Sequence, residues 1–157
     1  MLEINLDSGK KLNLKNLVLD YNGTIAFDGK IIKGVKEKIF TLSKKLDIYI
    51  VTADTFGTVR EEFKDDKINI EIIDDKYSGT KYKEKFIKNL GRENTIAIGN
   101  GFNDNAMLDK AKISLVIVGK EGSAVKTVLN ADIIITNIID ALDLLLHNNR
   151  LKATLRR

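Results

Sequence analysis

The chain has 157 residues, which is long enough for one domain with a sizeable core and short for two. Apolar residues make up 43% of it and charged residues 31%, a balance that is typical of a folded domain and argues against long disordered segments. The sequence contains no cysteine, which excludes disulfides, thiolate catalysis and cysteine metal sites.

The formal net charge of +4 comes mainly from lysines spread along the whole chain. This spacing is typical of solvated helix faces, and aromatic residues are not interleaved with the lysines, so we find no clear nucleic-acid signal. No apolar run approaches the length of a membrane span, and the first residues lack the pattern of a signal peptide. We therefore expect a cytoplasmic protein without a membrane partner. Residues 148–157, the most basic stretch, are expected to be an ordinary tail rather than a phosphate-binding arm.

Short β-branched runs alternate with segments of helical spacing along the chain. Residues 1–14 suggest a small antiparallel hairpin through DSGK. The predicted strands that follow are Leu17–Leu19, Ile48–Val51, Ile68–Ile73, Thr95–Ile98, Ser114–Val118 and Asp132–Ile135. Three predicted helical faces are named by their apolar residues: Val35, Ile39, Leu42 and Leu46 form the first, Val59 with Phe63 the second, and Tyr82, Phe86, Ile87 and Leu90 the third. Later predicted helices cover Asn105–Ala111, Ser123–Leu129 and Ile138–Leu146.

Alternating strands and helices predict right-handed βαβ units and a parallel sheet with both faces covered. The strand runs are nearly continuous Val, Ile and Leu, as expected of strands that are buried on both sides. We therefore predict a single doubly wound, Rossmann-like α/β domain over residues 1–157. Its core lies at about residues 17–146, its sheet is mainly parallel, and its helices lie on both faces.

Ligands of such sheets bind at the carboxyl ends of the strands, so the residues after each strand matter most. Asp20 follows the first predicted core strand, Thr52 and Asp54 follow the second, and the loop Gly99–Asp104 follows another. Asn22-Gly23 after Asp20 has a simpler explanation as a tight hairpin turn. Three polar strand ends at one edge nevertheless predict a site.

The segments DYNGT, IYIVTAD and IAIGNGFNDNAML together resemble the haloacid dehalogenase superfamily. The resemblance is closest to the phosphorylation domain of P-type ATPases and to soluble phosphatases built like it, and it covers about residues 17–146. Its most specific part is G-x-G-x-N-D after a strand and before a helix. It implies a magnesium-dependent phosphohydrolase or phosphotransferase that acts on a phosphorylated substrate.

The resemblance also implies residue roles. Asp20 would be the nucleophile that forms an aspartyl phosphate, and Asn22 stands at the acid–base position. Backbone N–H groups around Tyr21 to Gly23 would form an anion nest. The groups expected to hold phosphate are Tyr21, Gly23, Thr52, Lys83 and Asn103. Those expected to serve Mg²⁺ are Asp20, the main-chain carbonyl of Asn22, Asn100 and Asp104.

Three neighbouring lysines compete for the phosphate-binding role, namely Lys81, Lys83 and Lys85. In the P-type pattern the lysine precedes apolar residues by four and by seven positions. Lys83 meets this pattern with Ile87 and Leu90, so we choose Lys83 and expect the other two on a solvated helix face.

Structural explanations remain open for several of these residues. Thr52 can be an ordinary strand-end hydroxyl, and Asp54 or Thr55 can cap a helix. Asp104 can cap a helix and support the metal site at once. His147 is the only histidine and is expected to be exposed and inert.

Two amides stand where the family usually has acids. Asn22 cannot protonate a leaving group or activate water, which predicts slow chemistry and a preference for good leaving groups. Asn100 is an uncharged and weaker ligand for Mg²⁺ than aspartate. Because both amides precede glycine, spontaneous deamidation is favoured, and it would give a fraction of the protein acids at these two positions.

The segments after Thr24 and after Thr52 have room for a hairpin, a helix and a strand, so we expect no cap domain. An open site suits a large substrate, or a small one enclosed by another copy of the chain. The apolar helix over residues 138–146 is a candidate contact for such a copy, and core packing explains it equally well. Two alternatives to an enzyme remain open: a non-catalytic phosphate- or phosphoprotein-binding module with a degenerate site, and a phosphoacceptor switch. The sequence does not name the substrate.

Overall fold

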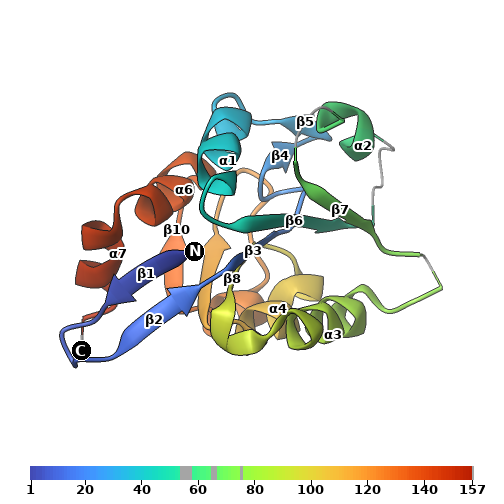
Figure 1. Cartoon of the computed structure of the whole chain (residues 1–157). Helices are drawn as coiled ribbons and strands as arrows, with labels where there is room; N and C mark the ends of the chain where they lie inside the picture. Colours follow the sequence, from blue (N-terminus) through green and yellow to red (C-terminus); the bar gives the residue numbers. More distant parts are fainter. Residues whose placement is uncertain (54–57, 65–66, 75, 157) are drawn as a thin grey trace.

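The structure is a computed structural model that describes residues 1–53, 58–64, 67–74 and 76–156. Its centre is a six-stranded sheet of order β10-β9-β8-β3-β6-β7 in which every neighbouring pair is parallel (Figure 1). The strands are β3 (Asn16–Leu19), β6 (Asp47–Thr52), β7 (Asn69–Ile72), β8 (Thr95–Gly99), β9 (Ile113–Ile117) and β10 (Ile133–Ile135). The predicted doubly wound α/β fold is confirmed.

Helices cover both faces of this sheet. α1 (Val35–Ser43) and α6 (Ile138–Leu146) lie against one face, and α3 (Gly79–Leu90) and α4 (Asn105–Lys110) lie against the other (Figure 1). Successive residues of a strand point to opposite faces. Leu17 and Leu19 therefore join the cluster under α1 and α6, whereas Val18 joins a second cluster under α3 and α4.

Shorter elements complete the chain. They are α2 (Val59–Glu62), α5 (Val125–Leu129), α7 (Asn148–Thr154) and two 3₁₀ turns, η1 (Arg92–Asn94) and η2 (Phe102–Asp104). α5 begins two residues later than predicted. The reason is that the Ser123 hydroxyl and the Ala124 N–H both donate to the carbonyl of Asn100, which draws these two residues into the loop after β8.

The predicted hairpin through DSGK forms, and the segment after Thr24, which has room for a hairpin, forms one as well. β1 (Leu2–Asn5) pairs antiparallel with β2 (Lys11–Leu14), and β4 (Ala26–Phe27) pairs antiparallel with β5 (Lys30–Ile31). Asp28 and Gly29 connect the second pair with φ values of 48° and 72°, which are the positive values that a two-residue hairpin turn of this type requires.

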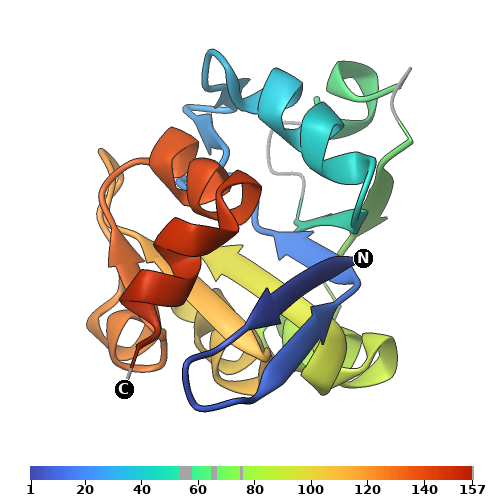
Figure 2. The same ribbon diagram turned by 60° about the vertical axis from the view of Figure 1, so that its left-hand side comes forward.

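The C-terminal segment, which the sequence predicts to be an ordinary tail, forms a helix that packs on the domain. Residues 148–154 form α7, which lies beside the β1–β2 hairpin (Figure 2). Leu151 is fully buried in the main core, and Lys152 and Arg156 both pair with Asp7 in the hairpin turn. Basic residues in this segment therefore stabilise an intramolecular contact.

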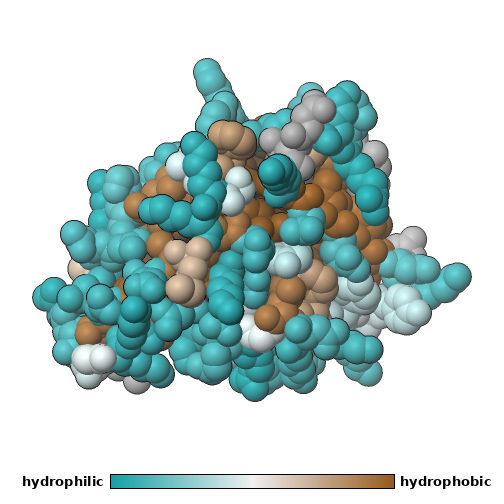
Figure 3. All heavy atoms as spheres, viewed as in Figure 1, coloured by the Kyte–Doolittle hydropathy of each residue, from teal (hydrophilic) through white to brown (hydrophobic). Residues whose placement is uncertain are grey.

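The apolar helix over residues 138–146 packs inside the chain. Ile138, Ala141, Leu142 and Leu145 are buried, and α6 lies against α1. Hydrophilic side chains cover most of the face shown in Figure 3, with apolar atoms visible between them. None of the helices in the described ranges has the length and apolar character needed to cross a bilayer.

Candidate active site

Strand register brings three of the predicted site residues to one edge of the sheet. Leu19 of β3 lies opposite Ile50 of β6 and opposite Ile98 of β8. Asp20 comes one residue after Leu19, Thr52 comes two residues after Ile50, and Asn100 comes two residues after Ile98. Because the three strands are parallel, these residues lie together at their carboxyl ends.

Lys83 of α3 connects this edge with the loop after β8. Its Nζ lies 2.6 Å from Asp20 Oδ1 and 2.6 Å from Asp104 Oδ1. The side chains of Lys83 and Asp104 are fully buried, and that of Asp20 is 9% exposed. Lys81 and Lys85 are exposed on the outer side of the same helix. Of the three candidate lysines, Lys83 is therefore the one that the fold brings to Asp20.

The charges of this group are unequal, because two carboxylates share one ammonium. Burial, together with the nearby Asp104 carboxylate, raises the pKa of Asp20 to about 6, against the lowering effect of Lys83 and Thr24. Burial by itself lowers the pKa of an ammonium, but the two carboxylates outweigh it and raise the pKa of Lys83. Lys83 is therefore charged at neutral pH, and the site is suited to an additional cation.

Thr24 is a site residue that sequence reasoning missed. Its buried hydroxyl lies 3.1 Å from Asp20 Oδ2 and 3.1 Å from Asn100 Oδ1, so it bridges the ends of β3 and β8. The sequence feature that could have indicated Thr24 is its position in DYNGT, two residues after Asn22.

Asp104 organises the loop after β8. Its Oδ2 accepts hydrogen bonds from the N–H of Asn100 at 3.0 Å and from the N–H of Gly101 at 2.9 Å. Asp104 therefore caps a helical turn as predicted, but the turn that it caps is η2, and its side chain does not cap α4. A Cβ on Gly99 would lie 2.6 Å from Asp104 Cγ, so glycine is needed there for the carboxylate to reach this position.

Gly23 has a different role from the one predicted. Its N–H donates to the carbonyl of Ala26 at 2.8 Å and so does not point into an anion nest. Its φ is 80°, and a Cβ would lie 2.3 Å from Nδ2 of Asn100. Glycine is required at this position because the Asn100 side chain packs against it.

The Asn100 amide makes a contact that a carboxylate could not make. Its Nδ2 donates to the carbonyl of Gly122 at 3.1 Å, while its Oδ1 accepts from Thr24. Two carbonyl-type oxygens would repel one another in the first contact. The amide thus ties the loop after β9 to the loop after β8.

The oxygen atoms at this edge fit a magnesium ion, although with few charges. No cluster of three or more acidic or histidine side chains forms within the described ranges. Asn22 Oδ1, however, is buried without a hydrogen-bond partner among the described residues, and an orphaned oxygen of this kind points to a ligand. Asp20, Asn22 and Asn100 supply the hard oxygen atoms that Mg²⁺ prefers.

The other predicted residues lie around this centre. Thr52 is the last residue of β6 and is buried. The side chain of Tyr21 is buried and donates to the carbonyl of Gly29 at 3.3 Å, so it supports the β4–β5 hairpin. Asn103 is exposed and packs against Gly79 at the start of α3. His147 is exposed, as predicted. Asp54 and Thr55 lie outside the described residues.

Solved structures with the same fold include several phosphatases. A putative 3-deoxy-D-manno-octulosonate 8-phosphate phosphatase from Vibrio cholerae is 15% identical, with a TM-score of 0.69 over 97% of this chain and 98% of that one. The 3-deoxy-D-manno-octulosonate 8-phosphate phosphatase of Moraxella catarrhalis, in complex with magnesium, phosphate and a KDO molecule, is 18% identical, with a TM-score of 0.66 over 89% of this chain and 90% of that one. A putative haloacid dehalogenase superfamily hydrolase from Legionella pneumophila is 12% identical, with a TM-score of 0.69 over 90% and 86%.

Curated relatives and a family model match the sequence itself. The uncharacterized protein MJ0073 of Methanocaldococcus jannaschii is 47% identical over 87 residues, which are 52% of this chain and 94% of the relative. The uncharacterized protein MJ0072 of the same organism is 56% identical over 39 residues, 25% of this chain and 89% of the relative. The model for haloacid dehalogenase-like hydrolases matches residues 52–141, more than half of the chain, including Lys83 and the loop after β8. The chain therefore belongs to the family of haloacid dehalogenase-like hydrolases.

Proposed function

We propose that the chain is a magnesium-dependent phosphohydrolase that works through an aspartyl phosphate on Asp20. The observation that carries this proposal is the buried group of Asp20, Lys83 and Asp104 at the carboxyl edge of the sheet. A carboxylate held beside an ammonium and a hydroxyl is suited to attack phosphorus, because the neighbours stabilise charge that develops there. The fold shared with solved phosphatases supports the same reaction class.

The first half-reaction would transfer the phosphoryl group to the protein. A carboxylate oxygen of Asp20 attacks phosphorus, the ester P–O bond breaks, and the leaving group departs with its electron pair. Lys83 and Thr52 would bind the phosphate oxygens, where negative charge lies in the transition state. Asp104 would act as a positioning residue, because one of its oxygens holds Lys83 and the other holds the loop after β8.

The second half-reaction would return the enzyme to its starting state. Water attacks phosphorus, the P–O bond to Asp20 breaks, and phosphate leaves together with the proton that water has lost. Asn22 can neither give nor take this proton, since an amide does not titrate near neutral pH. We therefore propose slow turnover of the phosphoenzyme.

Asp20, Asn22 and Asn100 are the groups we propose as ligands for Mg²⁺, with Asn22 contributing its main-chain carbonyl or its side-chain oxygen, which has no hydrogen-bond partner among the described residues. When bound, the ion screens the charge of Asp20 from that of the phosphate. The Asn100 amide is already bonded to Thr24 and Gly122, so its oxygen is held in place for this role while it contributes no charge.

The test is release of 4-nitrophenol from 4-nitrophenyl phosphate, with and without magnesium. This leaving group needs little protonation, so the amide at position 22 does not hide activity. Asp20→Asn should abolish turnover, and Asp109→Asn, which changes an exposed acidic residue on α4, should retain it. Equal turnover in wild type and Asp20→Asn would refute the assignment. Phosphate binding without turnover or covalent capture would favour the binding module, and stable phosphorylation of Asp20 by acetyl phosphate with a conformational change would favour the switch.

A further inference from the structure

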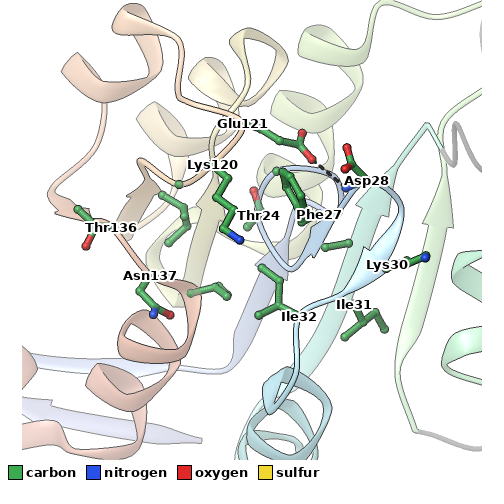
Figure 4. A pocket seen from close by; sticks show the side chains of 15 residues that line it. Thr24, Phe27, Asp28, Lys30, Ile31, Ile32, Lys120, Glu121, Thr136 and Asn137 are labelled. Atoms are coloured by element: carbon green, nitrogen blue, oxygen red, sulfur yellow. Dashed lines mark hydrogen bonds between the residues drawn. The ribbon is translucent and has the colours of Figure 1, made fainter.

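A cavity of about 570 Å³ opens beside the catalytic edge. Its walls come from the β4–β5 hairpin, the loop after β9 and the start of α6 (Figure 4). Gly23 and Thr24 are among its lining residues, and the Thr24 hydroxyl lies 3.1 Å from Asp20 Oδ2. The volume lies within the range of sites for small molecules.

The cavity is mainly apolar at its base. The aliphatic residues that line it are Ala26, Ile31, Ile32, Ile117 and Ile138. Phe27 adds an aromatic ring that remains 37% exposed. These surfaces would gain from contact with an apolar part of a ligand.

Lys120 brings a positive charge to this apolar space. Its Nζ lies 5.3 Å from the centre of the Phe27 ring, and Figure 4 shows the side chain extending into the cavity. None of the ion pairs among the described residues includes Lys120. Glu121, the adjacent acid, points instead to the N–H of Asp28 and accepts its hydrogen bond at 3.2 Å.

We propose that this cavity holds the leaving group of the substrate, and that Lys120 selects leaving groups that combine an apolar face with a carboxylate. An ammonium pairs well with a carboxylate beside a low-dielectric surface, and the isoleucine side chains and Phe27 offer an apolar surface to the rest of the leaving group. The proposal rests on the proposed function, since it assigns the remainder of the molecule whose phosphate Asp20 attacks. The cavity takes no part in making or breaking bonds.

Two substrates that differ in one group test the selection. They are phenyl phosphate and 4-carboxyphenyl phosphate, and the quantity measured is the ratio of their kcat/KM values. Wild type should prefer the carboxylated substrate about tenfold, which is typical of one charge-assisted contact. Lys120→Gln should bring the ratio close to one. Lys81→Gln removes an exposed lysine on the outer side of α3 and should keep the wild-type ratio.

A second measurement does not depend on turnover. Calorimetric titration with the product 4-hydroxybenzoate should show binding to wild type and to Lys81→Gln, and at least tenfold weaker binding to Lys120→Gln. If wild type hydrolyses 4-nitrophenyl phosphate but does not prefer the carboxylated substrate, the role of Lys120 in selection is wrong while the proposed function stands. If the preference decreases equally in Lys120→Gln and Lys81→Gln, the preference comes from long-range charge, and the role of Lys120 is wrong as well. If no phosphate ester is hydrolysed, the proposed function fails, and the Lys120-dependence of 4-hydroxybenzoate binding decides whether the cavity is a carboxylate site.

Discussion

Lys83 and Asp104 form an ion pair at 2.6 Å in which neither side chain reaches solvent. The helix that carries Lys83 and the loop that carries Asp104 lie on the same side of the sheet, and the pair joins them beside Asp20. Removing one member of a buried pair leaves an uncompensated charge, so this contact has consequences for both stability and chemistry.

Lys83→Met should destabilise the protein by about 3–5 kcal/mol, because two buried carboxylates lose their common partner. Urea denaturation followed by circular dichroism measures this loss. Lys81→Met, two positions away and exposed, should stay within about 0.5 kcal/mol of wild type. Similar stabilities for the two variants would show that the buried ion pairs do not form in solution.

Asn22→Asp should restore the missing proton donor. We expect kcat on an alkyl phosphate such as glycerol 2-phosphate to rise about 100-fold, since general acid–base assistance contributes about 10²–10⁴-fold. The increase on 4-nitrophenyl phosphate should be much smaller in the first step, because its leaving group needs little protonation. Burst kinetics separate the two steps. Equal acceleration of phosphoryl transfer from both substrates would contradict a leaving-group role for position 22.

Gly23→Ala tests the close approach of the Asn100 side chain. Gly9 has nearly the same positive φ, 79° against 80°, but nothing lies within 4 Å of a Cβ placed there. Gly9→Ala should therefore cost only about 1 kcal/mol, whereas Gly23→Ala should cost a further 1–3 kcal/mol or so. Adding Asn100→Ala to Gly23→Ala should recover most of the additional loss in a double-mutant cycle. The same cost at both glycines would exclude the predicted clash.

The raised pKa of Asp20 predicts how stability depends on pH in magnesium-free protein. The folded state keeps the proton up to about pH 6, whereas the ordinary aspartate pKa of 3.8 applies when the chain is unfolded. This contribution to stability is fully present below about pH 4 and is lost as pH rises through about 6. Relative to Asp20→Asn, wild type should therefore lose up to about 3 kcal/mol over this window. Parallel stability profiles of the two proteins would contradict the raised pKa.

The fold protects both Asn-Gly sequences from deamidation. Cyclisation needs the glycine nitrogen as nucleophile, but the N–H of Gly23 donates to Ala26 and the N–H of Gly101 donates to Asp104. Intact mass spectrometry after prolonged incubation at pH 9 should show the amidated mass for folded protein and a rising acid fraction in urea. Asp104→Ala frees the N–H of Gly101 and should allow conversion of Asn100 in the folded state. Conversion of the wild type at the rate seen in urea would mean that these N–H groups are not engaged.

The sheet could be predicted from the sequence because uninterrupted β-branched runs indicate buried parallel strands. The choice of Lys83 came instead from the resemblance to the P-type pattern, whose spacings of four and seven Lys83 meets with Ile87 and Leu90. The helix over residues 148–154 was missed because its buried face depends on Leu151 among charged residues. Those charges find their partner in Asp7, far away in sequence.

The finer features of the site depend on contacts that no local pattern contains. Asn22-Gly23 has a sufficient explanation as a turn, which hid the bridging position of Thr24. The N–H of Gly23 was expected to face an anion, but the strand-like pairing with Ala26 uses it. The cavity at Lys120 needs three segments that are far apart in the sequence, so only the folded chain reveals it.

The two hydrophobic clusters differ in size and in the helices that they support. The larger one lies under α1 and α6, and the smaller one lies under α3 and α4, the helices next to the buried ion pairs. Volume changes at Val18, Ile87 or Met107 would move Lys83 and Asp104 relative to Asp20 without altering any group that meets a substrate. Substitutions in the small cluster should thus change the rate of the proposed reaction through the geometry of the buried ion pairs.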